Sequence, residues 1–147
     1  MIAVQYPEPQ FRIRKEGEQS FIFDAIRRSW LLLTEEEWVR QNFIQYLVAV
    51  LQYPSTSIAV EKTLTLNGLK KRFDLLVYDR DTKPWMLVEC KAPAVPLSQD
   101  VLQQALRYHM SVPVPYIVIT NGKYTAAWQK DAGTLQQLHR LPQWSEA

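Results

Sequence analysis

The sequence predicts an α/β protein in which a mixed central sheet is flanked by helices. Apolar runs on both sides of Asn67-Gly68 and Asn121-Gly122 indicate two strand–turn–strand units. Two other segments carry apolar residues at helical spacing. Together with an alternating segment near the start of the chain, they give the order ββ–α–βββ–α–ββ, which is typical of a sheet covered by helices.

The first elements are a hairpin and a helix. Residues 11–23 alternate around Lys15-Glu16-Gly17-Glu18 and predict a hairpin with a longer loop. A helix is expected from about 34 to 52, with Thr34 as N-cap and Glu37 at the position of a capping-box partner. Its apolar residues recur every three or four positions, and Tyr53-Pro54-Ser55 ends it.

The central elements follow. Strands are expected over 57–66, 70–78 and 85–91, and the last two are apolar on both faces, as central strands are. Ser98 can cap a helix that reaches about residue 110, in which His109 packs inward. Strands over 116–120 and 124–128 complete the pattern, and the tail from residue 131 is weakly patterned.

Length and composition narrow the class of protein. The chain has 147 residues, of which 47% are hydrophobic and 22% charged, so residues 1–147 are expected to form a single domain. One cysteine excludes an intramolecular disulfide and favours a reducing compartment, and no signal peptide or membrane span is visible, so a cytoplasmic location is expected. The net charge of +2 is compatible with nucleic acid binding but does not argue for it.

A charged set interrupts the predicted central strands. Asp74 lies on one strand, and Glu89-Cys90-Lys91 ends the next. Alternation places Glu89 and Lys91 on the same face with Cys90 on the other, and antiparallel pairing can bring Asp74 beside Glu89. Two adjacent carboxylates repel unless a proton or a cation lies between them. Mg²⁺ suits such oxygen ligands, and a lysine beside it can orient water, so the set supplies the parts for metal-assisted phosphodiester hydrolysis.

The sequence also resembles a known family. The segments LTEEEWVRQNF (33–43), KRFDLLVYD (71–79), LVECKAP (87–93), QALRY (104–108) and VITNG (118–122) are similar to the N-terminal nuclease domain of type I restriction enzyme R subunits. This resemblance spans about residues 5–142 and implies a restriction-endonuclease-like fold of the PD-(D/E)XK superfamily. It maps the catalytic triplet onto Asp74, Glu89 and Lys91, and a Q-x-x-x-Y element onto Gln104 and Tyr108.

The chain departs from that family in two respects. The residue before Asp74 is Phe rather than Pro, which such families tolerate. No G-x-x-x-x-G-K-[ST] phosphate loop is present, so this chain cannot translocate DNA by itself. The resemblance therefore implies a stand-alone nuclease-like domain whose partners are DNA and a separate restriction or helicase subunit. A homodimer is also considered, and the oligomeric state stays open.

Several further residues are candidates for accessory roles. Glu36 is favoured over Glu35 and Glu37 as an extra acid of the site, because it falls on the same helix face as Arg40. Glu37 points away from that face and suits the capping box. The alternative for Glu36 is that it only lies in a solvated first turn. Glu61 interrupts the strand that should pair with that of Asp74, and an exposed charge or ion pair explains it equally well.

The basic and helical candidates also have two interpretations. Lys70, Lys71 and Arg72 come just before Asp74, and Arg72 lies on the same strand face as Asp74. This basic cluster either contacts phosphate or is only a charged start of the strand. Gln104 and Tyr108 share one helix face and either contact the nucleotide or hold Lys91. The two histidines lack partners at metal-ligand spacing, and no basic–aromatic alternation along the chain marks a base-stacking groove.

The expected function is therefore a Mg²⁺-dependent nuclease, with Mn²⁺ as a substitute metal, that hydrolyses DNA phosphodiester bonds. Asp74 and Glu89 would bind the metal, and Lys91 would position or activate water. The alternative is a non-catalytic DNA- or protein-binding module with a nuclease fold that serves a restriction or repair complex. DNA versus RNA, endo- versus exonuclease action and sequence preference stay open.

Overall fold

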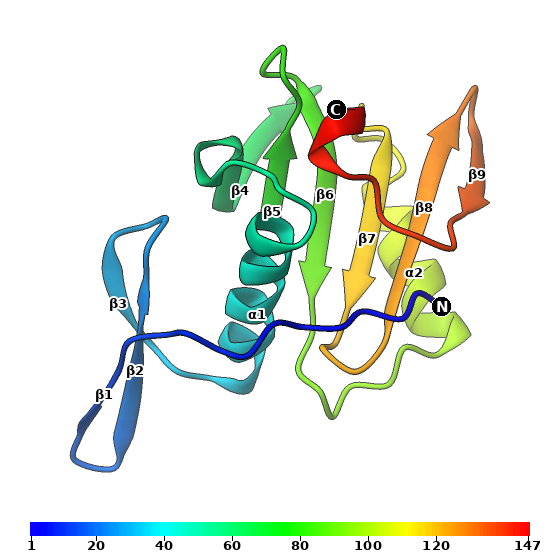
Figure 1. Ribbon diagram of the computed structural model, residues 1–147. Helices are drawn as coiled ribbons and strands as arrows, with labels where there is room; N and C mark the ends of the chain where they lie inside the picture. Colours follow the sequence, from blue (N-terminus) through cyan, green and yellow to red (C-terminus); the bar gives the residue numbers. More distant parts are fainter.

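The computed structural model describes residues 1–147 and contains two sheets and two α-helices. A small antiparallel sheet, in the order β1-β2-β3, is formed by β1 (Ile13–Glu16), β2 (Gln19–Asp24) and β3 (Ser29–Leu32). It lies beside α1 (Glu35–Ala49), away from the main sheet (Figure 1). No helix is long and apolar enough to cross a membrane.

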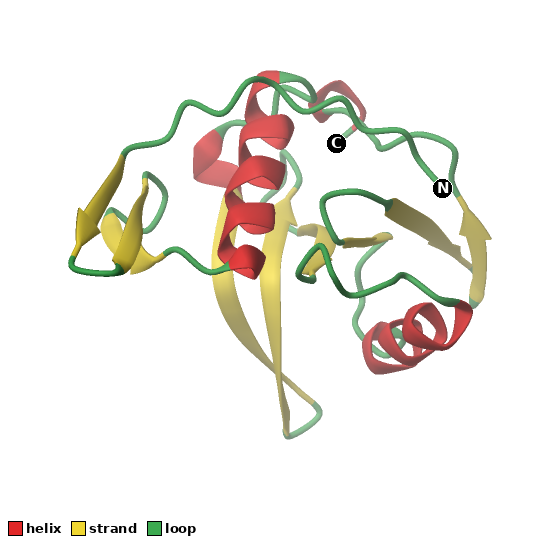
Figure 2. Ribbon diagram, turned by 90° about the horizontal axis from the view of Figure 1, so that it is seen from below, coloured by secondary structure: helices red, strands yellow, loops and turns green.

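The main sheet has six strands in chain order. They are β4 (Ile58–Leu66), β5 (Leu69–Tyr78), β6 (Pro84–Cys90), β7 (Tyr116–Thr120), β8 (Thr125–Asp131) and β9 (Thr134–Gln137). Only β6 and β7 are parallel, and α2 (Gln99–His109) connects them. Helices α1 and α2 cover opposite faces of this mixed sheet (Figure 2). The α/β class predicted from sequence is therefore confirmed.

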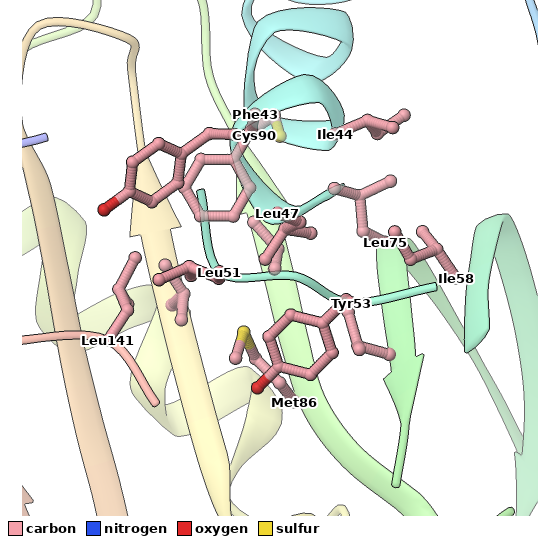
Figure 3. Close-up of a cluster of buried hydrophobic side chains, with 14 of the residues drawn as sticks. Phe43, Ile44, Leu47, Leu51, Tyr53, Ile58, Leu75, Met86, Cys90 and Leu141 are labelled. Atoms are coloured by element: carbon pink, nitrogen blue, oxygen red, sulfur yellow. The ribbon is translucent and has the colours of Figure 1, made fainter. Parts of the chain in front are cut away.

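The largest core cluster lies between α1 and the sheet. Phe43 and Leu47 of α1 and Leu75, Met86 and Val88 of the sheet are fully or almost fully buried in it. Side chains from β5, from β6 and from the segment that follows α1 meet there (Figure 3). On the other face, two smaller clusters pack beneath α2 and the segment after it. Burial on both faces explains the nearly continuous apolar runs of the central strands.

Local turn chemistry explains how β4 and β5 join. Asn67 and Gly68 both have positive φ, 50° and 80°, and connect the strands through a two-residue turn. The hairpin is long and extends beyond the body of the protein (Figure 2). The strand expected over 57–66 begins one residue later, after a short 3-10 helix at Ser55–Ser57.

Two sequence-based predictions need correction, and two strands lie outside the predicted elements. The loop of the first hairpin is short, because Lys15 and Glu16 still pair with β2 and only two residues turn. Helix α1 ends at Ala49 rather than near 52. Strands β3 and β9 were not predicted: β3 follows a turn with Arg28 at φ 53°, which carries no Gly or Pro signal, and β9 is short and polar.

Candidate active site

Three acidic residues occupy matching positions on three neighbouring strands. The pairs Val60–Leu75 and Lys62–Phe73 bracket Glu61 and Asp74, so these two acids lie opposite each other on β4 and β5. The β5–β6 ladder ends at the pair Leu75–Val88, and the next positions along the two strands are Asp74 and Glu89. Asp74 is thus flanked by an acid on each side, and its predicted proximity to Glu89 follows from the strand register.

Asp74 lies where the ladder between β5 and β6 ends. Its Oδ2 accepts a hydrogen bond from the Cys90 backbone N–H at 2.7 Å, and its Oδ1 accepts one from Arg40 Nη2 at 3.3 Å. Burial raises the pKa of Asp74, and the charges of Glu89 and Glu61 add to that rise, against the lowering by the two hydrogen-bond donors. An ionised Asp74 is therefore held in place but is not fully neutralised.

Glu89 and Lys91 form the second part of the site. Lys91 Nζ is 3.5 Å from Glu89 Oε2, and both side chains are about a quarter exposed, at 29% and 26%. The other carboxylate oxygen lies 3.5 Å from Nε2 of the buried His109. His109 is the main cause that lowers the pKa of Glu89, and Lys91 contributes in the same direction. Cys90 is buried and packs in the core beneath α1, as expected from strand alternation.

The Q-x-x-x-Y pair lies at the same place. Glu89, Lys91, Gln104 and Tyr108 line one cavity of about 300 Å³, which α2 closes on one side. Neither Gln104 nor the Tyr108 hydroxyl has a hydrogen-bond partner within the protein, and Tyr108 is 46% exposed. The geometry thus brings the two helix residues to Glu89 and Lys91 and leaves their polar atoms free.

Arg40 connects α1 to Asp74. Its guanidinium is 6% exposed and contacts four carboxylates: Glu37 at 2.8 Å, and Glu36, Glu61 and Asp74 at 3.3 Å each. Nε of Arg40 is buried without a partner. The arginine therefore acts as a fixed internal cation between α1 and the acidic strands.

Glu37, one of three glutamates in the first turn of α1, differs from expectation. Thr34 does cap the helix, because its Oγ1 accepts the Glu37 N–H at 3.0 Å. The Glu37 carboxylate, however, does not return to the cap: it is 8% exposed and binds Arg27, Arg40 and Gln41. The assignment of Glu37 as the capping-box partner is wrong, because buried guanidinium groups bind its carboxylate instead.

Glu36 is more exposed than Glu37, with 48% of its side chain accessible. Burial of the rest and the charge of Asp74 raise its pKa, while Arg40 and Lys91 lower it. It therefore lies within the electrostatic reach of Asp74 and Lys91, but the predicted facing direction is wrong, because Glu37 rather than Glu36 is the glutamate buried against Arg40.

The basic cluster before Asp74 is divided. Arg72 Nη2 donates to Glu61 Oε2 at 2.6 Å, so its charge is engaged by an acid although the side chain is 64% exposed. Lys71 donates to the Tyr108 carbonyl and to Ser111, and thereby ties β5 to the end of α2. Only Lys70 of the three is exposed without a partner.

Sequence reasoning missed the residues that anchor the small sheet to this site. Arg27 bonds Asp24 at 2.6 Å and Glu37 at 3.0 Å and lies 3.6 Å from Glu61. Gln41 Nε2 donates to Asp24 and to Glu37. The only sequence signal for these contacts is Asp24 at the end of an apolar strand, followed by Arg27 and Arg28. Such a pattern is too common in proteins to indicate a specific contact.

The carboxylates of the site suit some metal ions and not others. No three His, Cys, Asp or Glu side chains converge closely enough to hold an ion by themselves. This excludes a zinc-like cage but suits Mg²⁺, which typically takes one or two carboxylates and completes its shell with water and phosphate. Burial is the main cause that raises the pKa values of Asp74 and Glu36, and the charges of neighbouring acids add to the rise.

Fold and site together define a mixed α/β protein with two carboxylates and a lysine where two central strands separate. A family model described as the type I restriction enzyme R protein N terminus matches residues 35–142. The chain therefore belongs to that restriction-enzyme family. None of the curated proteins searched matches this chain.

Proposed function

We propose that this protein is a Mg²⁺-dependent nuclease that hydrolyses DNA phosphodiester bonds, and that Mn²⁺ can replace Mg²⁺. The observation that carries the proposal is the meeting of Asp74, Glu89 and Lys91 at the end of the β5–β6 ladder, beside a cavity that Gln104 and Tyr108 also line. Family membership supports a role in restriction.

Asp74 and Glu89 would hold the metal through one carboxylate oxygen or more each, because both are partly exposed and their charges repel each other. When bound, Mg²⁺ lowers the pKa of its water and neutralises charge on the phosphate. The Arg40 contact at Oδ1 favours the ionised form of Asp74, and the Cys90 N–H binds Oδ2, so the carboxylate is oriented in advance.

Lys91 has a separate role. Its ammonium group projects into the cavity next to Glu89, where it can donate to the attacking water or to a phosphate oxygen. In the hydrolysis, water oxygen forms the new bond to phosphorus and the bond to the leaving oxygen breaks, so negative charge grows on the phosphoryl oxygens. A fixed cation beside that position stabilises this charge. The free polar atoms of Gln104 and Tyr108 would hold the adjacent nucleotide.

A second candidate function rests on Arg40. Its guanidinium already binds Asp74 Oδ1, so a cation of the protein stands where a metal would add charge. If metal cannot compete, the fold serves as a non-catalytic DNA- or protein-binding module. In either case a restriction or helicase subunit is the proposed protein partner, because the family is that of the N terminus of a restriction enzyme R protein.

Cleavage of DNA with a metal titration tests the proposal. Supercoiled plasmid, linear duplex and an RNA duplex are incubated with wild type, Lys91→Ala and Lys83→Ala while Mg²⁺ or Mn²⁺ is raised to about 10 mM, a range suited to weak hard-ion sites. Lys83 is an exposed lysine in the β5–β6 loop and serves as the matched control. Wild type and Lys83→Ala should cleave DNA in the presence of metal, and Lys91→Ala should not.

Two results would contradict the proposal. Equal cleavage by Lys91→Ala and wild type would remove Lys91 from the mechanism. DNA binding without cleavage under either metal would favour the binding module instead.

A further inference from the structure

The outer face of the small sheet carries arginines stacked on aromatic rings. The Arg12 guanidinium lies over Phe23 at 4.8 Å and over Trp30 at 5.3 Å, measured to the ring centroids. Arg14 lies over the same Trp30 ring at 4.5 Å. We call these four residues the cation–aromatic face.

The strand register explains why this surface cannot be recognised from the order of residues in the sequence. Arg14 pairs with Phe21, and Phe23 pairs with Trp30, so the arginines and the rings lie on one face of the sheet but on three different strands. The opposite face carries Ile22 and Asp24, which are completely buried, and Asp24 bonds Gln41 of α1. The cation–aromatic face is therefore the opposite face of the sheet, and at its edge Arg12 and Phe23 border a cavity with Gln45 of α1.

The charges on this face are available. Arg12 forms no ion pair, and Arg14 contacts only Glu16, at 3.1 Å with both side chains about half exposed. An exposed pair of this kind contributes little and is easily exchanged. A guanidinium stacked flat on a ring keeps its N–H groups pointing outward in its own plane, and that fork matches two phosphate oxygens. Two such groups side by side fit successive phosphates of a sugar–phosphate backbone better than they fit a single acidic side chain.

This surface adjoins a cleft that Arg40 lines, and Arg40 binds Asp74 of the candidate active site. Leu32 lies two residues after Trp30 on β3, hence on the same face, and it also lines a cleft of about 610 Å³ with Glu36, Arg40 and Glu61. Arg27, in the turn between β2 and β3, binds Glu37 and lies near Glu61, so the small sheet is fixed to the site. Figure 2 shows the sheet beside α1 on the side opposite α2.

We propose that the cation–aromatic face binds the phosphate backbone of DNA that enters the cleft, and so positions the duplex relative to Asp74. The inference rests on the proposed function, whose substrate is DNA. It assigns this task to residues 12–30, which precede the part of the chain that the family model matches, residues 35–142. Stacking on Phe23 and Trp30 holds the guanidinium groups in advance, so little side-chain freedom is lost on binding.

Salt-dependent DNA binding tests the assignment. Fluorescence anisotropy of a labelled 20-base-pair duplex is measured in EDTA, so that no hydrolysis occurs, with wild type, Arg12→Gln/Arg14→Gln and Arg80→Gln. Arg80 is the matched control, because it too stacks on a tryptophan, Trp144 at 4.7 Å, near the C-terminus of the chain. Losing two phosphate contacts should reduce the slope of log affinity against log salt by about 2. Between 50 and 200 mM salt, wild type should then lose about tenfold more affinity than the double variant.

The outcomes separate this inference from the proposed nuclease activity. Arg80→Gln should behave like wild type. Arg12→Lys/Arg14→Lys should keep the salt slope, because it keeps both charges. This lysine variant also provides a test of the surface if the glutamine variant does not fold. An unchanged slope in a folded glutamine variant, or no DNA binding by wild type, would overturn the inference; the first result would favour an acidic protein surface as the occupant. Normal binding without cleavage would refute the nuclease and leave this surface standing.

Discussion

Glu37 should be the most stability-sensitive acid of the site, and Glu37→Gln isolates its charge. Its carboxylate accepts two contacts of 3.0 Å from Arg27, one of 2.8 Å from Arg40 and one of 3.1 Å from Gln41. Glutamine keeps one acceptor oxygen but turns an amide N–H₂ toward side chains that are themselves donors. Breaking a buried ion pair on one side costs about 3–5 kcal/mol, and the retained oxygen places the expected loss near 3 kcal/mol.

Calorimetric melting at neutral pH without divalent cations measures this loss. About 3 kcal/mol corresponds to a fall in Tm of roughly 6–12 °C for a chain of this size. Glu36→Gln is the matched control, because it makes the same chemical change one residue earlier, at a half-exposed side chain with one 3.3 Å contact to Arg40. That variant should change stability by less than about 1 kcal/mol. Equal effects of the two variants would refute the assigned burial of Glu37, and a larger effect at Glu36 would place α1 in a different rotation.

Three other predictions follow from the same contacts. Asp74→Asn should raise the Tm of the metal-free protein at neutral pH, because folding raises the pKa of Asp74 and the ionised carboxylate therefore destabilises the folded state. Below the ordinary aspartate pKa the side chain is neutral in both proteins, so their Tm values should not differ. His109→Phe should raise the pKa of Glu89, whose main lowering cause is His109, and the low-pH limb of cleavage should move to higher pH while Lys83→Ala leaves it unchanged. Gln104→Ala should lower cleavage at least tenfold with an unchanged Tm if it holds the nucleotide, since its side chain bonds nothing in the protein; a fall in Tm with normal cleavage would indicate a structural role.

Much of the main sheet could be predicted because its signals are local. Asn67-Gly68 suits a turn that needs positive φ at both residues, and the apolar run over 75–77 in the returning strand indicates burial on both faces of the sheet. The positions of Asp74 and Glu89 follow from that hairpin and from the short loop to β6, so their proximity could be derived before the structure. The resemblance added Gln104 and Tyr108, whose helical spacing alone says nothing about the cavity they line.

The missed features depend on contacts between distant parts of the chain. Glu37 was assigned to the cap because Thr34 lies three residues before it, and nothing nearby in sequence shows that Arg27 would reach its carboxylate. The cation–aromatic face was missed for the same reason, because Arg14 and Trp30 meet only after three strands are aligned. Strand β9 carries mostly exposed polar residues, and only pairing with β8 makes it a strand.

The central claim is that Asp74 and Glu89 bind a divalent cation, and thermal melting tests it without any substrate. Wild type and Asp74→Asn are melted with and without about 10 mM Mg²⁺, a concentration chosen for weak hard-ion sites, with NaCl of equal ionic strength as the control. A cation that binds only the folded state stabilises by RT ln(1 + [L]/Kd), about 2.7 kcal/mol at a hundredfold excess over Kd. Wild type should therefore gain roughly 5–10 °C in Tm with Mg²⁺ and Asp74→Asn should gain almost nothing. An equal response of the two proteins would show that Asp74 is not a ligand and would contradict the proposed metal site.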